Sequence, residues 1–294
     1  MSRIRRSRGE QIFNVFNIAF MILLMLACLY PFWYVIMASF SRPTLILGHR
    51  GGLLFPLGFS LQAYEAVFAN RSIWIGYYNT IIYVVGGTCI NIVMTIMGAY
   101  YLSRRFAPCK KFVMLLILFT MYFSGGMIPT FLNIRNLGLL DTRWAILLPG
   151  AISTFNLIIM RTAFASIDAS MEESAMLDGA GHWTIMFRIM LPLAKATVAV
   201  LVLYYGVGHW NSWFSAMLYL SDEALKPLQL VLREILIVNS ANATQGGGGD
   251  ADSELLSETI QYATILVATV PILCLYPFLQ KYFVKGMMVG ALKG

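Results

Sequence analysis

Charged residues are scarce in this sequence, in which aspartate, glutamate, lysine and arginine together make up 12% of the 294 residues. A soluble domain carries about 25% charged residues, so the composition excludes a protein whose whole surface faces water. Acidic residues number 14 against 21 lysines and arginines, giving a net charge of +7. A basic excess can indicate nucleic-acid binding, but here the distribution of the basic residues explains the excess and no nucleic acid is expected.

Histidine and cysteine are also rare, with three and four residues. The histidines at 49, 182 and 209 are scattered and the cysteines lack metal-ligand spacing, so the sequence predicts no metal site and no catalytic residue. This argues against an integral membrane enzyme. A phosphate-binding glycine loop is missing as well, so the chain by itself cannot supply ATP hydrolysis.

Hydrophobic residues, in contrast, make up 59% of the chain and gather in long runs. Each run is near the roughly 20 residues that a helix needs to cross the hydrocarbon layer. The runs are too long for barrel strands of about 9–11 residues. The sequence therefore predicts an all-α integral membrane protein with about six transmembrane helices, at 12–38, 74–100, 112–132, 143–161, 197–220 and 259–284.

The basic residues fall mostly in alternate loops, and this bias predicts that both termini lie in the cytoplasm. The first apolar run is too long for a signal peptide and lacks a clear cleavage site, so we interpret it as a retained span. The predicted organisation is a cytoplasmic N-terminus at 1–11 and one transmembrane domain at 12–294. Within that domain we expect a long inner loop at 162–196, an outer loop at 221–258 and a cytoplasmic tail at 285–294.

The inner loop contains a distinctive helical pattern. Ser170 followed by Glu173 is a capping-box pattern, which predicts the start of a short helix. Gly179 and Gly181 are expected to end or sharply bend that helix. A second short helix should lead to Pro192, which suits the first turn of the fifth span.

The same segment, Glu173-Ser-Ala-Met-Leu-Asp-Gly-Ala with Leu191-Pro192 downstream, resembles the EAA loop of ABC-importer permeases. Ser174 replaces the middle alanine, and Ala196 stands where many relatives have a second proline. In that family the loop forms a coupling helix that inserts into a cleft on the ATPase subunit. The resemblance implies that the ATPase-coupling residues are Glu172, Glu173, Ala175, Asp178, Gly179 and Ala180.

Trp210-Asn211, residues 225–229 and the ending at 286–294 resemble the carbohydrate branch, that is, the smaller permease subunit of the maltose-type transporter. The sequence is similar nearly end to end to LplC/YtcP-like oligosaccharide permeases. This implies a multi-pass subunit of a binding-protein-dependent importer in the bacterial cytoplasmic membrane. Its substrate would be an oligosaccharide, including an acidic, uronate-containing one.

The resemblance also implies partners. They are a second homologous permease subunit, two ATP-binding cassette subunits, an extracytoplasmic solute-binding protein and the surrounding membrane lipid. ATP and Mg²⁺ would bind to the ATPase subunits, and this chain would bind no cofactor. The glycine run at 246–249 either reaches into the binding protein or is a flexible linker.

Polar and aromatic residues inside the predicted spans could line a sugar pathway, or could hydrogen-bond between helices as structural contacts. His209 stands out because an ionisable group within the membrane is a functional candidate. An ion-coupled transporter acting without an ATPase is the alternative function, but the spans have few of the paired ionisable groups it needs. The pathway candidates are Asn79, Tyr83, Asn91, Asn156, Tyr204, His209, Trp210 and Asn211.

Overall fold

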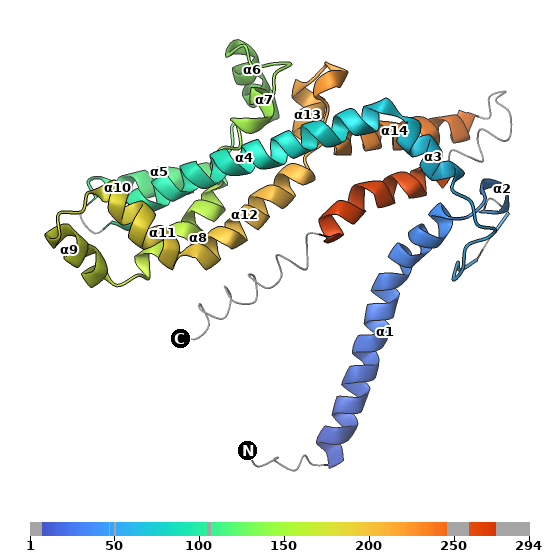
Figure 1. Cartoon of the computed structure of the whole chain (residues 1–294), viewed down its shortest axis with the longest axis horizontal. Coiled ribbons are helices and arrows are strands. Elements are labelled where there is room, and N and C mark those ends of the chain that lie inside the picture. The colour runs from blue at the N-terminus through green and yellow to red at the C-terminus, as the bar shows by residue number, and fades with distance from the viewer. Residues whose placement is uncertain (1–7, 47, 50, 105–106, 246–258, 275–294) are drawn as a thin grey trace. The chain divides into compact units, whose positions relative to one another are not determined.

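A computed structural model of the chain describes residues 8–46, 48–49, 51–104, 107–245 and 259–274 (Figure 1). The regular structure in these ranges is helical, apart from a β-bridge between Ser41 and Phe59, which agrees with the predicted all-α fold. The chain divides into two compact units. One contains Met1–Asn70 and Ile235–Thr269, and the other contains Arg71–Glu234 and Val270–Gly294.

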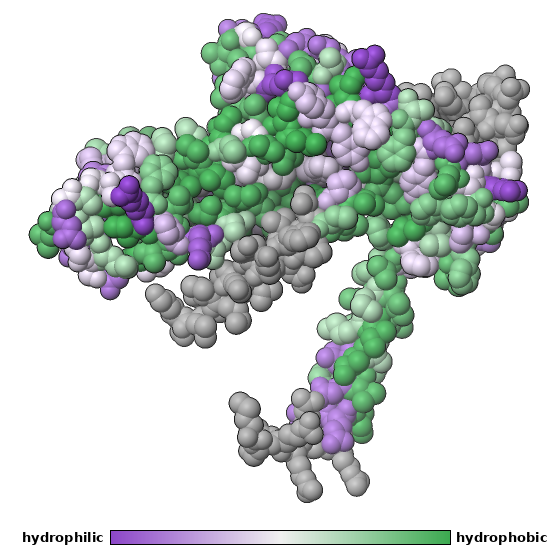
Figure 2. All heavy atoms as spheres, in the orientation of Figure 1, coloured by the Kyte–Doolittle hydropathy of each residue, from purple (hydrophilic) through white to green (hydrophobic). Residues whose placement is uncertain are grey.

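The first unit is dominated by α1, Arg8–Ser39, a helix of 32 residues. At 1.5 Å per residue it is about 48 Å long, more than enough to cross a bilayer. Hydrophobic side chains cover most of its length in Figure 2, and they are exposed, as expected of a helix that contacts lipid. Two short helices follow, α2 (Pro43–Ile46) and α3 (Gln62–Ala69).

The second unit is organised around α4, Arg71–Ser103, a helix of 33 residues. It packs along α12 (Lys195–Trp210) and α8 (Thr154–Ala165), and the three helices lie side by side in Figure 1. Shorter helices surround these three. They are α5 (Lys110–Tyr122), α6 (Met127–Asn136), α7 (Trp144–Leu147), α9 (Ala169–Leu177), α10 (His182–Thr184), η1 (Ile185–Met190), α11 (Leu191–Leu193), α13 (Phe214–Tyr219) and η2 (Glu223–Leu225).

Two helices in the described ranges are long and apolar enough to cross a membrane unaided, at 9–39 and 71–103. They coincide with the first two predicted spans. Two bent pairs bring the count to as many as four if each pair is one span: α5 with α6, bent by 115°, and His182–Leu193 with α12, bent by 84°. The six-span count therefore stays a prediction.

Three predicted spans are wrong as continuous helices. The span at 112–132 breaks where Gly126 adopts a positive φ of 88°, which glycine accommodates without steric cost. The span at 143–161 breaks between α7 and α8, where Pro149 removes a backbone donor. The span at 197–220 ends early, because α12 stops at Trp210 and α13 begins at Phe214.

The predicted outer loop at 221–258 also holds a helix that the sequence analysis missed, α14 (Leu228–Gln245). The sixth predicted span is described only as a helix at Thr259–Cys274. The glycine run at 246–249 and the tail at 285–294 lie outside the described residues.

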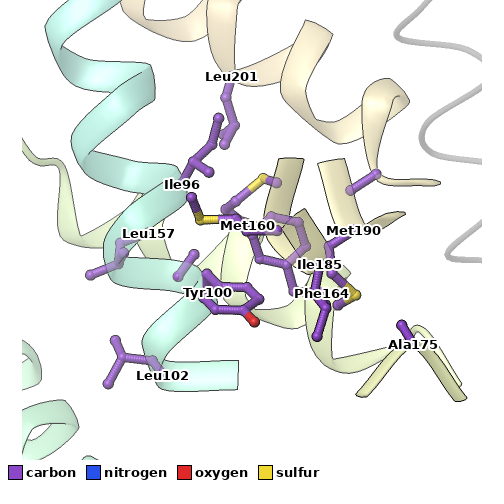
Figure 3. Packing of buried hydrophobic residues seen from close by; sticks show 13 residues of the cluster. Ile96, Tyr100, Leu102, Leu157, Met160, Phe164, Ala175, Ile185, Met190 and Leu201 are labelled. Carbon is purple, nitrogen blue, oxygen red and sulfur yellow. The ribbon is translucent and has the colours of Figure 1, made fainter. Parts of the chain in front are cut away.

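A hydrophobic cluster at one end of the second unit joins α4, α8 and the segment from α9 to α12 (Figure 3). Met160 and Phe164 of α8 are almost fully buried between α4 and η1. The cluster fixes the position of the segment that the sequence analysis singled out. Its labelled members in Figure 3 are Ile96, Tyr100, Leu102, Leu157, Met160, Phe164, Ala175, Ile185, Met190 and Leu201.

Candidate functional site

The start of α9 is set by Asp168. Its carboxylate accepts a hydrogen bond from the backbone N–H of Ser170 at 2.9 Å, so Asp168 is the N-cap. The predicted capping box of Ser170 and Glu173 is therefore wrong. Aspartate caps helices as well as serine does, and with Asp168 available the helix begins before Ser170, which lies in its first turn.

The end of α9 is a Schellman motif, in which two amides close back onto the last turn. The N–H of Gly179 donates to the carbonyl of Met176 at 3.0 Å, and the N–H of Ala180 donates to the carbonyl of Ala175 at 2.9 Å. The motif needs a left-handed residue after the helix, and Gly179 has φ of 81°. The predicted termination at Gly179 is confirmed, with Asp178 as the C-cap.

One face of α9 packs against its own chain. Ala175 is 9% exposed and belongs to the hydrophobic cluster with Phe164 and Ile185, as Figure 3 shows. Ala180 packs against the edge of the same cluster. The small side chain of Ala175 thus lets α9 lie close to the body of the second unit.

The opposite face of α9 is exposed and carries an apolar side chain. Leu177, two residues from Ala175 and therefore about 200° around the helix, is 89% exposed. Glu173, four residues before Leu177 and therefore on the same face, is also exposed. Sequence reasoning missed Leu177, although its position opposite the small Ala175 could have indicated that it points outward.

A second set of contacts ties this segment to the end of α4. The guanidinium of Arg104, just after α4, forms an ion pair with Glu172 and lies over the ring of Tyr100, 4.6 Å from its centroid. The hydroxyl of Tyr100 lies 3.3 Å from Nδ1 of His182. Arg104, Glu172 and His182 also line a cavity of about 350 Å³ between α4 and α9.

The chain after α9 turns sharply into α12. It passes through α10, the π-helical turn η1 and α11, and then bends by 84° before α12 begins at Lys195. Pro192 therefore lies before the bend, and its predicted place in the first turn of the fifth span is wrong. The π turn directly precedes this proline, which cannot donate a backbone hydrogen bond.

Two of the pathway candidates hold the chain at the other end of α4. Asn79 donates from Nδ2 to the carbonyls of Ala224 (2.7 Å) and Lys226 (3.2 Å), and its Oδ1 accepts from Arg143 (3.1 Å). Tyr83 donates to the carbonyl of Leu225 at 2.8 Å. Both side chains thus make the kind of structural contact that the sequence analysis left open as their alternative role.

Asn91 and His209 form a polar contact between α4 and α12. Nδ2 of Asn91 donates to the carbonyl of Gly150 at 2.6 Å, so Oδ1 is the atom that faces His209. Nε2 of His209 lies 2.6 Å from that oxygen and therefore carries the donated proton.

The remaining pathway candidates are not gathered in one place. Asn156 is buried in the first turn of α8, whereas Tyr204 and Asn211 are exposed on and just after α12. Trp210 is buried against Tyr77, with ring centroids 6.4 Å apart, and its indole N–H has no hydrogen-bond partner among the described residues. It lines an apolar cavity of about 540 Å³ between α4 and α12.

Two known proteins are similar to this chain over nearly its whole length. No protein-family model matches the sequence. The chain is 41% identical to the polygalacturonan/rhamnogalacturonan transport system permease protein YtcP of Bacillus subtilis (strain 168), over 97% of this chain and 99% of that protein. It is 40% identical to protein LplC of the same strain, over 99% and 98%.

A solved structure is similar over nearly the whole chain. A chain of a bacterial ABC transporter involved in the import of the acidic polysaccharide alginate superimposes with a TM-score of 0.87 at 34% identity. The match covers 96% of this chain and 100% of that one. This membrane protein therefore belongs to the family of permease subunits of sugar ABC transporters.

Proposed function

We propose that this chain is the permease subunit of a binding-protein-dependent importer of oligosaccharides, including acidic, uronate-containing ones. The names of two similar proteins support the substrate class, since one transports polygalacturonan and rhamnogalacturonan and the other belongs to an importer of alginate. All three polymers carry carboxylates. The chain would act in the bacterial cytoplasmic membrane.

In this proposal the chain forms half of a translocation pathway with a second, homologous permease. Two ATP-binding cassette subunits bind ATP and Mg²⁺ and hydrolyse the nucleotide, and an extracytoplasmic protein delivers the sugar. Of the pathway candidates, Trp210 and Tyr204 suit contact with a sugar ring, because aromatic faces pack on apolar sugar faces. Asn79, Tyr83 and His209 would shape that pathway, because their polar side-chain atoms are engaged within the chain. Asn156 and Asn211 remain candidates for contact with the sugar.

The coupling role is carried by one observation: α9 buries Ala175 in its own chain and exposes Leu177 on the opposite side. A fixed, capped helix with an exposed apolar anchor suits recognition in which a helix inserts into a groove of its partner. We propose that this face, with Glu173 beside it, inserts into the ATPase subunit. Asp178, Gly179 and Ala180 then hold the end of the helix in shape.

Burying a leucine contributes about 1.5–3 kcal/mol, so Leu177→Asp should weaken binding of the ATPase subunit by about 10-fold or more. The measurement is co-purification of the assembled importer, titrated with ATPase subunit. Leu137→Asp is the matched control, because Leu137 is 63% exposed but lies outside α9. Equal binding by the two variants would contradict the coupling role.

The substrate class has a separate test. Vesicles that contain the complete importer should take up oligogalacturonates in the presence of ATP and the binding protein. Neutral oligosaccharides of the same length are the control. Uptake of the neutral sugars alone would contradict the acidic substrate.

A further inference from the structure

Two neighbouring carboxylates on α9 have different surroundings. The side chain of Glu172 is 19% exposed and pairs with Arg104, whose own side chain is 12% exposed. Glu173 is exposed. Successive helical residues point about 100° apart, so the two side chains leave the helix in different directions, although both border the cavity between α4 and α9. Glu172 faces the chain's own α4.

Arg104 makes several contacts at the end of α4. Its guanidinium pairs with Glu172 of α9 and lies over Tyr100, while Tyr100 contacts His182 of α10. Its backbone carbonyl accepts a hydrogen bond from Lys110 of α5 at 2.7 Å. Arg104 therefore connects the end of α4 to α9 and α5, and Tyr100, over which its guanidinium lies, connects α4 to α10.

The connection between α4 and the start of α9 depends on these polar contacts. A cavity of about 350 Å³ lies between the two helices at this point, lined by Tyr100, Arg104, Glu172 and their neighbours. The apolar anchor of α9, Ala175, lies on the next turn. Loss of the ion pair would therefore release the first turn of α9 from α4.

The same helix α4 carries contacts far from this end. Asn91 meets His209 of α12, and Asn79 and Tyr83 hold residues 224–226. An unbroken helix of 33 residues connects these positions to Arg104. A displacement applied to α9 would thus reach the opposite end of α4 as a movement of one rigid element.

We propose that Arg104, supported by Tyr100, is a positioning residue that latches α9 to α4 through Glu172, so that α4 follows the movement of the docked coupling helix. This inference rests on the proposed function, in which the ATPase subunit binds α9. Glu173 and Leu177 would then dock the ATPase, while Glu172 and Arg104 would transmit its movement.

The test uses the complete importer in vesicles, with three readouts: ATPase binding, ATP hydrolysis, and sugar uptake per ATP hydrolysed. Arg104→Gln should leave ATPase binding unchanged and reduce uptake per ATP by about 5-fold or more, the lower end of coupling between linked sites. Lys111→Gln, which neutralises an exposed charge on α5, is the control and should change none of the three.

Exchanging the charges of Arg104 and Glu172 should rescue the coupling of uptake to ATP hydrolysis. Arg104→Glu combined with Glu172→Arg should restore most of the uptake per ATP, whereas Arg104→Glu alone should not. Unchanged uptake per ATP in Arg104→Gln would contradict the positioning role of Arg104. Loss of ATPase binding in that variant would contradict it too, as would a charge exchange that fails to restore uptake per ATP. Normal ATPase binding in Leu177→Asp would instead contradict the coupling role proposed for α9, so the two failures are distinguishable.

Discussion

Nε2 of His209 lies 2.6 Å from Oδ1 of Asn91, and this contact joins α12 to α4. The imidazole ring also lies directly against Gly87, where even a methyl group would collide with it. Asn91 and Gly87 lie one turn apart on α4, and both contact the Nε2 edge of the ring, so together they fix its position. The two helices approach closely because position 87 has no side chain.

Gly87→Ala should therefore destabilise the protein, by about 1–3 kcal/mol, because the added methyl overpacks the ring of His209. Gly86→Ala is the matched control, since a methyl there meets nothing within 4 Å. Thermal unfolding in detergent compares the two. If the two variants unfolded at the same midpoint temperature, the packing of His209 on α4 would be contradicted.

Gly179→Ala should fray the end of α9. The φ of 81° costs a non-glycine residue about 1–2 kcal/mol, although a methyl would have open space. Gly181→Ala, also with open space but φ of −74°, should be nearly neutral. Hydrogen exchange of the Gly179 and Ala180 amides is the measurement, and faster exchange is expected only for the first variant.

Asp141 should make the conformation of residues 221–226 sensitive to acid. Its Oδ1 accepts hydrogen bonds from the backbone N–H groups of Asp222 (2.9 Å) and Ser221 (2.5 Å), and these bonds lower the pKa of the Asp141 carboxyl in the folded protein. A lowered folded pKa stabilises the fold above the unfolded pKa of about 3.9, and the stabilisation is lost as pH falls through the folded value.

Limited proteolysis of residues 221–226 between neutral pH and pH 3 measures this effect. Cleavage should increase at the acid end in the unmodified protein. Asp141→Asn should be cleaved more readily at neutral pH and show less change with pH, because asparagine also tolerates the φ of 55° but carries no charge. Identical pH profiles would show that the carboxylate is not responsible.

The predicted topology is tested by labelling from outside the cell. In a background where the native cysteines are replaced by serine, an impermeant thiol reagent should modify Glu223→Cys but not Leu177→Cys. Both positions are highly exposed, at 83% and 89%, so accessibility within the chain is matched. The reverse labelling pattern would place α9 outside and remove its coupling role.

Much of this arrangement follows from the sequence, and the rest depends on tertiary contacts. The length of the apolar runs predicted α1 and α4, and Gly179 predicted the end of α9. Both signals are local, since each depends only on residues of one helix or one turn. The N-cap was misassigned since Asp168 and Ser170 are equally good caps, and only the folded chain selects one.

Contacts between residues far apart in the chain could not be predicted from local sequence signals. Arg104 and Glu172 are far apart in sequence, and so are Asn91 and His209. The apolar composition of residues 112–132 predicted a span, but hydropathy does not register the positive φ of Gly126 that breaks the helix. Residue type alone also cannot tell a pathway residue from Asn79, whose amide is used to hold the backbone at 224–226.

The central claim, that α9 docks on an ATPase subunit through Leu177, is tested most directly by site-specific photo-cross-linking in the intact importer. p-Benzoylphenylalanine replaces Leu177 in one sample and the exposed Leu137 in another. The account predicts a covalent adduct with the ATPase subunit from position 177 and none from position 137. An assembled importer that gives no ATPase adduct from position 177 would contradict it.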